Sequence, residues 1–395
     1  MISLATHRRW IIILGIITAI GPMSIDMYLP ALPSMQAHFG VSTGQIQLTL
    51  SIYFIGLAFG QLLYGPLADR FGRRALLLIG LGIYTVASVV CVLAPGIEVL
   101  SLGRLMQALG GCAGMVITRA MVRDRFEPED TARIFAALVL VMGVAPILAP
   151  LVGGQLLNFF DWHSVFVVLT VFGALCWGLA LTGLQETLAQ RGEPIRLSAV
   201  LRGYARLLVD RRFMAYSLAS GLASAGMFSY ISGSAFVFIE VFGISPQHFG
   251  WYFGANAAGF VVVSQFNHRL LRRSTPDQLL RRALLAYAGF SVVLVALAAS
   301  GIGGLWGVAV PLFLVMSSLG LIYPNATAMA MAPFGANAGL ASAAMGTLQF
   351  TVAAVGGAAV GHLHDGTALP MAAVIAACAL TAAGQLRVLA PVKDQ

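Results

Sequence analysis

Long apolar runs separated by short polar segments recur along the whole chain. Twelve of these runs have about the 20-residue length that an α-helix needs to cross the hydrocarbon core of a bilayer. The pattern predicts an all-α polytopic membrane protein with twelve transmembrane helices. The predicted spans are residues 10–32, 46–67, 75–95, 99–118, 134–158, 163–185, 213–239, 247–267, 283–300, 304–332, 338–362 and 369–389.

The longest polar stretch follows the sixth run and extends over residues 186–212. We therefore expect two six-helix bundles, residues 1–185 and 213–395, joined by a cytoplasmic linker. A short repeat supports two related halves, because the five residues that begin at Arg73 have the same sequence as the five that begin at Arg281. Parallel halves of six helices are typical of transporters whose substrate site lies between the halves near the membrane midplane.

Composition agrees with a membrane location. Of the 395 residues, 59% are apolar and 10% are charged, whereas about 25% of the residues in a soluble domain are charged. His7, Arg8 and Arg9 before the first run also suggest a secretory signal peptide. Against that interpretation, no small-residue cleavage site follows, and Pro22 and Asp26 interrupt the apolar segment.

The arrangement of charges predicts the topology. With a cytoplasmic N-terminus, every Lys and Arg except Arg104 falls on the cytoplasmic side. The opposite loops carry Glu98, Asp161, Glu240 and Asp365 without a basic residue, as the positive-inside rule requires. The net charge of +8 thus indicates orientation and not a nucleic-acid partner. We expect a bacterial inner membrane protein, in contact with lipid, with both termini in the cytoplasm.

Two intramembrane charges are the leading functional candidates. Asp26 is the sole acidic residue of the first predicted span, and a carboxylate at that depth costs about 2.5–3.5 kcal/mol. At 1.5 Å per residue, Asp26 lies about 24 Å from the inner end of its span and Arg104 about 8 Å inside the outer face, so their depths nearly coincide. We expect a direct or water-bridged contact, or a shared polar cavity. A permanent ion pair that only stabilises the bundle is the alternative.

Residues 65–74 read GPLADRFGRR and connect the second and third spans. The glycines permit a tight turn, and the aspartate can cap a helix end or pair with an arginine. We expect this segment to act as a conformational latch between the halves and not to contact substrate. The residues assigned to the latch are Gly65, Asp69, Arg70, Gly72 and Arg73.

Glycine and proline residues also occur within other predicted spans. The fifth span carries GVAPILAPLVGG, in which Pro146, Pro150, Gly153 and Gly154 are candidates for a kinked, closely packed helix. Span eleven contains a Gly-x-x-x-Gly pair at residues 357 and 361, and three other spans contain similar pairs. This spacing allows backbones to approach closely, and we interpret the pairs as ordinary helix packing.

These motifs resemble those of the major facilitator superfamily. The segment 65–74 is similar to the superfamily's signature, the residues around Arg104 to its intramembrane arginine motif, and the fifth span to its antiporter motif. Ala149 stands where that antiporter motif usually has glycine. Residues 24–33, 226–240 and 249–253 resemble in particular the bicyclomycin-resistance type of drug and proton antiporter, and the likeness extends along nearly the whole chain.

The resemblance implies proton-driven export of small, drug-like compounds by a monomer without a cofactor. Spans one, four, seven and ten would line a central cavity between the halves. Methionine and aromatic side chains suit a wall that accommodates varied ligands. The cavity candidates are Met23, Asp26, Met27, Tyr53, Arg104, Met227, Tyr230, Phe236, Tyr323 and Asn325, and Asp26 with Arg104 would couple transport to protons. Glu240 is the sole substitute carboxylate.

Other functions fit less well. Lys393 is the only lysine, so the chain has neither the phosphate-binding loop of an ATPase nor an intramembrane Schiff-base lysine. No His-Glu-x-x-His or Gly-x-Ser-x-Gly motif indicates an enzyme. His362, His364 and Asp365 lack further ligands nearby, and no metal site is expected. A proton-coupled importer or facilitator of one metabolite remains the alternative within the same fold.

Overall fold

The computed structural model of this protein describes residues 4–188 and 197–390, and within them the chain forms helices and no strands. Arg191 and Lys393, part of the predicted cytoplasmic charge, lie outside the described residues, as does part of the predicted linker. The helices of the first half are α1 (Leu4–Thr18), α2 (Ile20–Asp26), η1 (Leu29–Ala31), α3 (Leu32–Phe39), α4 (Thr43–Phe71), α5 (Arg73–Val92), α6 (Ile97–Arg125), α7 (Pro128–Phe159) and α8 (His163–Gly183). Those that follow are α9 (Leu197–Val209), α10 (Arg211–Ala235), the π-helix η2 (Phe236–Val241), α11 (Pro246–Leu270), α12 (Pro276–Ser300), α13 (Gly304–Met331), η3 (Ala332–Asn337), α14 (Ala338–His362) and α15 (Leu369–Leu389).

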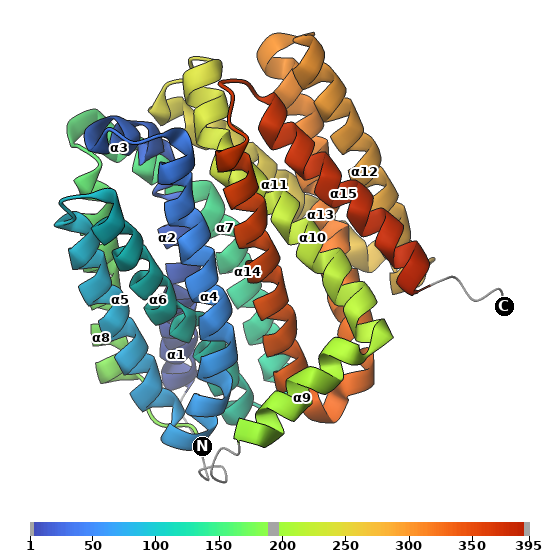
Figure 1. Cartoon of the computed structure of the whole chain (residues 1–395). Helices are drawn as coiled ribbons and strands as arrows, with labels where there is room; N and C mark the ends of the chain where they lie inside the picture. The colour runs from blue at the N-terminus through green and yellow to red at the C-terminus, as the bar shows by residue number, and fades with distance from the viewer. Residues whose placement is uncertain (1–3, 189–196, 391–395) are drawn as a thin grey trace.

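The long helices stand side by side and nearly parallel (Figure 1). Eleven segments of the described chain are long and apolar enough to cross a membrane. The one remaining predicted span, residues 247–267, is α11, which carries buried Asn256 and Asn267 and lies between α7 and α13. The arrangement is the expected all-α fold of twelve helices in two bundles.

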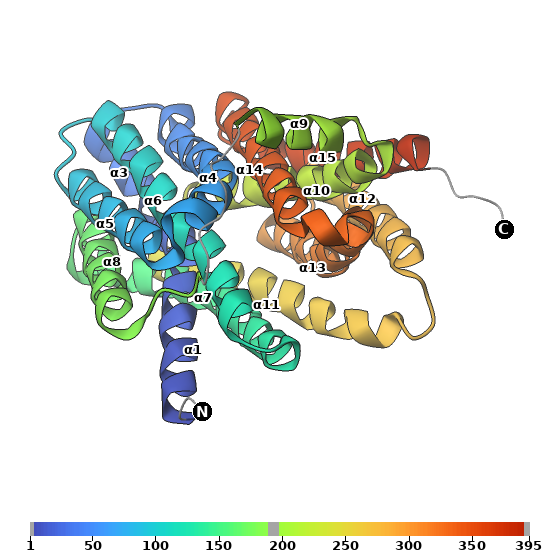
Figure 2. The same cartoon turned by 90° about the horizontal axis from the view of Figure 1, so that it is seen from below.

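The two halves are distinct when the molecule is seen along its helices (Figure 2). Helices α1–α8 form one half and α10–α15 the other. They meet along two seams, where α4 packs against α14 and α7 packs against α11. Any movement of one half relative to the other must therefore change the packing of these two pairs of helices.

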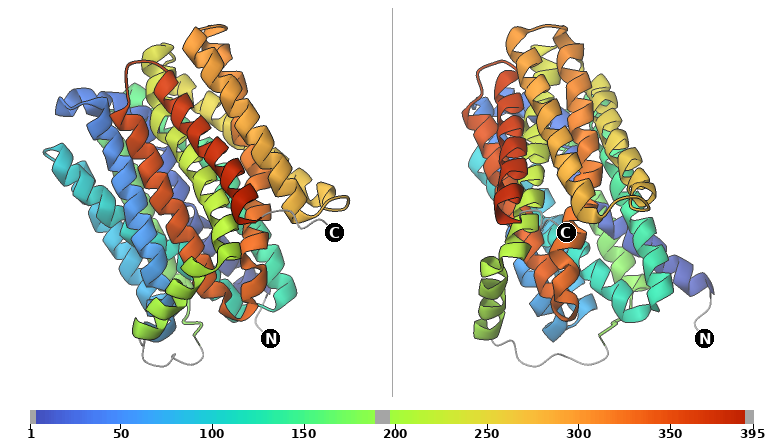
Figure 3. Two further views of the ribbon diagram at one scale, coloured as in Figure 1. Left: turned by 45° about the vertical axis from the view of Figure 1, so that its right-hand side comes forward. Right: turned by 90° about the vertical axis from the view of Figure 1, so that its right-hand side faces the viewer.

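One end of the bundle carries the arginines. Helices α4 and α6 end there with Arg70, Arg123 and Arg125, and α1 begins there. We call it the basic end, and we call the opposite end, where α3 lies, the outer end (Figure 1). The predicted linker is not wholly extended, because α9 forms within it and packs at the basic end against α10 and α14 (Figure 3).

The first span is broken, whereas the sequence predicts one continuous helix over residues 10–32. Helix α1 ends at Thr18 and α2 ends at Asp26, after which η1 and α3 turn along the outer end. Pro30 lies at the start of η1, where its missing N–H is tolerated. Asp26 is consequently the last residue of a short helix within the bundle.

Candidate functional site

Asp26 is buried and unpaired. Asp26 is 3% exposed. No salt bridge or hydrogen bond within the described chain involves its carboxylate. Its charge acts on Tyr53 of the first half and on Tyr230 of the second half. Asp26 thus lies where the two halves meet, and no basic side chain of the described chain forms an ion pair with it.

Arg104 is fully buried on α6 but does not contact Asp26. One of its terminal nitrogens, Nη1, donates to the backbone carbonyl of Ser24 over 3.0 Å and to Oε1 of Gln107 over 2.6 Å. Its Nε and Nη2 atoms have no hydrogen-bond partner among the described residues. The expected direct contact is therefore absent in this conformation, and the two charges are connected only through the backbone of α2.

Aromatic rings take the place of a counter-ion around Arg104. The guanidinium carbon lies 4.2 Å from the ring centre of Tyr53 and 4.5 Å from that of Tyr28. Phe166 of α8 lies further away, at 5.9 Å. Cation–π contacts are worth about 2 kcal/mol or more when they are desolvated, so the rings partly offset the cost of burying this charge.

Hydrogen bonds extend the site into the first half. Gln107 donates from Nε2 to the Ser88 hydroxyl over 2.8 Å, and the hydroxyls of Ser24 and Tyr84 lie 2.7 Å apart. The sequence reasoning missed these four residues. Gln107 alone carried a signal, because it lies three residues after Arg104 and so on the same face of the helix.

Three cavity candidates of the second half form a separate group. Tyr230 accepts a hydrogen bond from Nδ2 of Asn256 over 2.9 Å. The hydroxyl of Tyr323 lies 3.0 Å from the hydroxyl of Ser224 and 3.8 Å from the sulfur of Met227. These tyrosines place hydroxyl groups on the second half opposite the charges of the first.

The remaining candidates do not join these groups. Met27 is buried in the hydrophobic core, and the half-buried Met23 packs against that core. Phe236 lies near the outer end at the start of η2, and Asn325 donates to Oδ1 of Asn267 over 2.7 Å. The residues predicted to line one cavity thus lie at several separate places in the structure.

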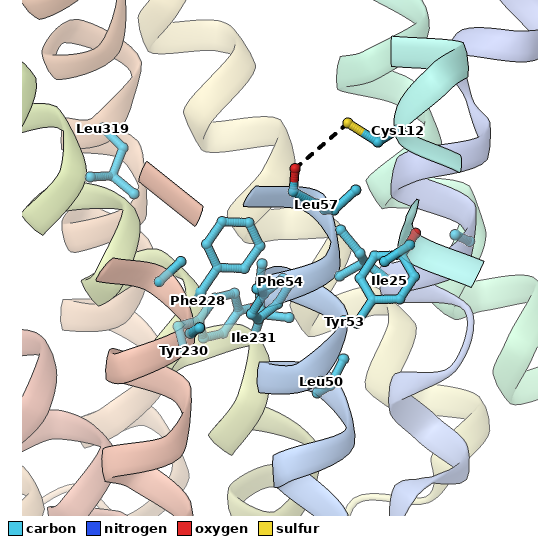
Figure 4. Close-up of a cluster of buried hydrophobic side chains, with 14 of the residues drawn as sticks. Ile25, Leu50, Tyr53, Phe54, Leu57, Cys112, Phe228, Tyr230, Ile231 and Leu319 are labelled. Carbon is cyan, nitrogen blue, oxygen red and sulfur yellow. Dashed lines mark hydrogen bonds between the residues drawn. The ribbon is translucent and has the colours of Figure 1, made fainter. Parts of the chain in front are cut away.

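An apolar layer joins the halves between these polar groups (Figure 4). The ring centres of Phe54 on α4 and Phe228 on α10 are 4.2 Å apart. Tyr53 points away from this contact toward α6, whereas Tyr230 and Ile231 lie on its other side (Figure 4). These side chains form an apolar contact between α4 and α10 beside the polar groups of the two halves.

The predicted latch is a network within the first half. Arg73 at the start of α5 pairs with Asp69 of α4 at 2.5 Å and with Asp124 of α6 at 2.9 Å. Gly65 does not form the expected turn, because α4 continues through it to Phe71. Of the two latch glycines, Gly72, with a φ of 100°, has a backbone conformation that favours glycine, and Gly65 is helical. These contacts tie α4, α5 and α6 together rather than one half to the other.

Glu186, which the sequence reasoning missed, completes this network. Its carboxylate accepts hydrogen bonds from the backbone N–H groups of Arg73 and Arg74, at 2.8 and 3.1 Å, and from those of Thr187 and Leu188. It therefore caps the first turn of α5 from beyond the end of α8. Partial burial raises the pKa of Glu186, but the four N–H groups outweigh burial and hold this pKa below its ordinary value of 4.5.

We expect Glu186→Gln to lower the free energy of unfolding by about 1 kcal/mol at neutral pH, as the loss of a helix cap does. Because the folded-state pKa is depressed, this stabilisation is present above pH 4.5 and is lost as the pH falls through the folded-state value. Thermal unfolding of both proteins across this pH range measures the difference. Glu127→Gln is the control, because Glu127 precedes α7 without making a capping bond; an equal effect in the control would contradict the assignment.

The second half repeats part of this network. Arg281 pairs with Asp277 at 2.7 Å, with the same four-residue spacing as Asp69 and Arg73. Arg281 also donates to the carbonyl of Ala390, just beyond the end of α15. In each half, the start of the third long helix is therefore bonded to the chain that follows the sixth, which extends the short sequence repeat to three dimensions.

A cavity of about 510 Å³ lies at the basic end between the halves. Four of the five latch residues, all except Gly72, contribute to it, but none of the cavity candidates does. Residues of α4 and α6 form one wall, and α14 and Tyr204 of α9 form the other. The lining residues are Gln61, Tyr64, Gly65, Pro66, Ala68, Asp69, Arg70, Arg73, Val116, Ile117, Arg119, Ala120, Arg123, Phe135, Tyr204, Gly339, Leu340, Ser342 and Ala343.

Two glycines of α7 allow close backbone contacts at the outer end. Pro146 and Pro150 lie within the continuous helix α7. A Cβ atom added to Gly153 would lie 2.1 Å from the carbonyl oxygen of Met27, and one on Gly154 would lie 2.4 Å from that of Pro246. The glycines of the predicted antiporter motif thus let α7 contact the backbones of the broken first span and of α11.

Known proteins resemble this chain along almost its whole length. The family description Major Facilitator Superfamily matches residues 14–358. The uncharacterised MFS-type transporter YdgK of Bacillus subtilis is 34% identical over 370 residues, which cover 92% of this chain and 90% of that protein. A bicyclomycin resistance protein homologue of Haemophilus influenzae is 29% identical over 372 residues, 93% of each chain.

The fold has solved counterparts. A bacterial homologue of the human lysosomal transporter Spinster, in an inward-facing and occupied conformation, has a TM-score of 0.76 at 16% identity, over 98% of this chain and 97% of that one. At that identity the likeness concerns the fold alone. The family match spans most of the chain and agrees with the arrangement of its helices. The similarity to the bicyclomycin resistance protein homologue agrees with the resemblance seen in the sequence, and this multi-pass membrane protein belongs to the major facilitator superfamily.

Proposed function

We propose that this protein exports small toxic compounds of varied structure in exchange for protons. The observation that carries the proposal is Asp26, a buried carboxylate without a cation at the meeting point of the two halves. An isolated buried charge is costly, and uptake of a proton removes that cost. Asp26 is therefore suited to alternate between a protonated and an ionised state during transport.

Arg104 supports the exchange without neutralising Asp26 permanently. Because Arg104 is bonded to the carbonyl of Ser24, its charge stays close to the end of α2. An exported compound and a proton would compete for this region, since each changes the balance of charge there. The aromatic groups of Tyr28 and Tyr53 beside Arg104 suit flat, apolar compounds.

The direction of transport rests on the charge distribution. We infer that the basic end faces the cytoplasm of a bacterial inner membrane, since arginines favour that side. The bundles 1–185 and 213–395 would then rock about the seams of α4 with α14 and of α7 with α11. One proton that moves inward supplies about 2.3 kcal/mol per 100 mV of membrane potential, and a pH gradient adds to this.

Transport in reconstituted vesicles tests the proposal. We expect export of a cationic dye to follow an imposed pH gradient and to stop when an ionophore collapses that gradient. The second test compares the resistance of the parent strain and of a strain that lacks the gene to a panel of unrelated toxic compounds. The strain that lacks the gene should be more sensitive to several of them. Saturable inward transport of a single metabolite, with no change in resistance, would instead establish the importer.

A further inference from the structure

Three buried polar side chains without partners lie between the halves, apart from the groups described above. Gln47 and Ser51 are one helical turn apart on α4, and Ser232 belongs to α10. The three residues are 0%, 3% and 0% exposed. Neither amide atom of Gln47 nor either hydroxyl has a hydrogen-bond partner within the described chain. We call these three residues the outer polar row.

The row faces the glycine pair of α14 that the sequence suggested was ordinary packing. A Cβ atom on Gly361 would lie 3.0 Å from Oε1 of Gln47, and one on Gly357 would lie 3.1 Å from the Ser51 hydroxyl and 3.8 Å from that of Ser232. The glycines thus bring α14 directly onto polar groups of α4 and α10. An apolar surface on α4 would suit this close packing better, so the polar groups require another reason.

Aromatic rings close the row toward the basic end. Phe54 follows Ser51 by three residues on α4, and Phe228 precedes Ser232 by four on α10. Their ring centres are 4.2 Å apart, and Phe350 of α14 lies 6.0 Å from Phe228. Because α4 runs inward and α10 runs outward, this ring layer lies on the basic-end side of the row.

The row and Asp26 lie at similar depths. Gln47 and Ser51 are about 6 and 12 Å inside the outer end of α4 at 1.5 Å per residue. In a hydrocarbon core about 30 Å thick, Asp26 is about 6 Å from the outer face. Tyr53, on which the charge of Asp26 acts, follows Ser51 by two residues. A path along the row therefore leads to the level of the central carboxylate.

Hydration of these three polar side chains is energetically favourable. A buried polar atom without a partner loses its hydration and gains no bond in return. The row joins α4 of the first half to α10 and α14 of the second, so separation of the outer ends would expose it. Water that enters there could bond to Gln47, Ser51 and Ser232 in turn, and chains of hydrogen-bonded water carry protons.

Resting on the proposed function, we propose that the outer polar row is the route by which water and protons reach Asp26 from the outer side. The ring layer of Phe54, Phe228 and Phe350 is the barrier that separates this route from the cavity at the basic end. Gln47 and the two serines are thus positioning residues for the proton and do not bind the exported compound.

The test replaces the row by apolar side chains of similar size, in a protein that carries Gln47→Leu, Ser51→Ala and Ser232→Ala. We expect gradient-driven export to fall about tenfold, the rate equivalent of one hydrogen bond to a charged group. Exchange of labelled for unlabelled dye at equal pH should persist, because it moves no net protons. Ser217→Ala is the matched control, since Ser217 is a buried, unpartnered serine near the basic end of α10.

Two outcomes overturn the proposal. Gradient-driven export at the wild-type rate would show that protons do not use the row. An equal loss of export and of exchange would show that the row governs the separation of the helices instead. A wild-type protein without gradient-driven export would contradict the proposed function itself, which is a different result.

A single variant covers the case in which the triple variant does not fold. Ser51→Cys should react with a membrane-impermeant thiol reagent applied from the outer side, whereas Ser217→Cys should not. Of the native cysteines, Cys91, Cys112 and Cys176 are buried, and Cys378 is half-buried, so the parent protein gives the background. Absence of labelling above that background at Ser51→Cys would equally overturn the proposal.

Discussion

Asp26→Asn is expected to lower gradient-driven export about a hundredfold or more, the loss typical of removing an essential proton-transfer group. The amide has the size of the carboxyl group but neither takes up nor releases a proton at neutral pH. Because the carboxylate has no partner within the described chain, the substitution should leave the fold and the binding of the compound intact. Export from vesicles with an imposed pH gradient, together with equilibrium dye binding, measures the two effects.

Glu240→Gln provides the comparison for this experiment. Glu240 is exposed near the end of η2, at the outer end of the bundle. We expect its amide variant to export at the wild-type rate. The reverse result, with Glu240→Gln inactive and Asp26→Asn active, would assign proton coupling to Glu240.

Arg104→Met should lower the rate of gradient-driven export about a hundredfold. The same substitution should change the free energy of unfolding by no more than about 2 kcal/mol. The guanidinium is buried and bonds to Ser24 and Gln107, but no carboxylate in the described part of the chain pairs with it. Removal of a buried charge that lacks an ionic partner recovers its desolvation cost, which offsets the lost hydrogen bonds and ring contacts. Thermal unfolding and vesicle export, measured on the same preparation, separate the two effects.

A permanent ion pair predicts something else for Arg104→Met. If Arg104 neutralised Asp26 throughout the cycle, its removal would leave an uncompensated carboxylate and cost about 3–5 kcal/mol. Arg104→Lys is the matched control, because it keeps the charge but loses the planar guanidinium fork, whose Nη1 atom bonds to both Ser24 and Gln107. Partial export by this variant would show that the positive charge at this position matters more for export than the planar shape of the guanidinium.

Composition and periodicity were sufficient to predict the membrane fold. Apolar runs separated by arginines define the spans, because the bilayer imposes both length and charge. The pattern could not predict that the first span breaks at Asp26, since apolar residues continue to Leu32. It also could not predict α9, because the stretch from residue 186 to 212 contains enough charge to resemble a polar linker.

The site was predictable in part. Depth along a helix follows from counting, so the similar levels of Asp26 and Arg104 could be estimated, but the direction of a side chain around its helix could not. The bond of Arg104 to the Ser24 carbonyl depends on the break in the first span. Asp124 and Glu186, which complete the latch, come from segments distant in sequence and carry no local signal.

Helix α9 limits how far the protein can open. A Cβ atom on Gly203 would lie 2.5 Å from the Leu340 side chain, so α9 fits closely on α14 and follows the second half. Leu188 belongs to the first half, and the chain between Leu188 and Leu197 can span about 30 Å at full extension. Covalent geometry thus sets an upper limit on the distance between Leu188 and Leu197, and we expect a deletion between them to narrow the widest opening at the basic end before any contact within either half is changed.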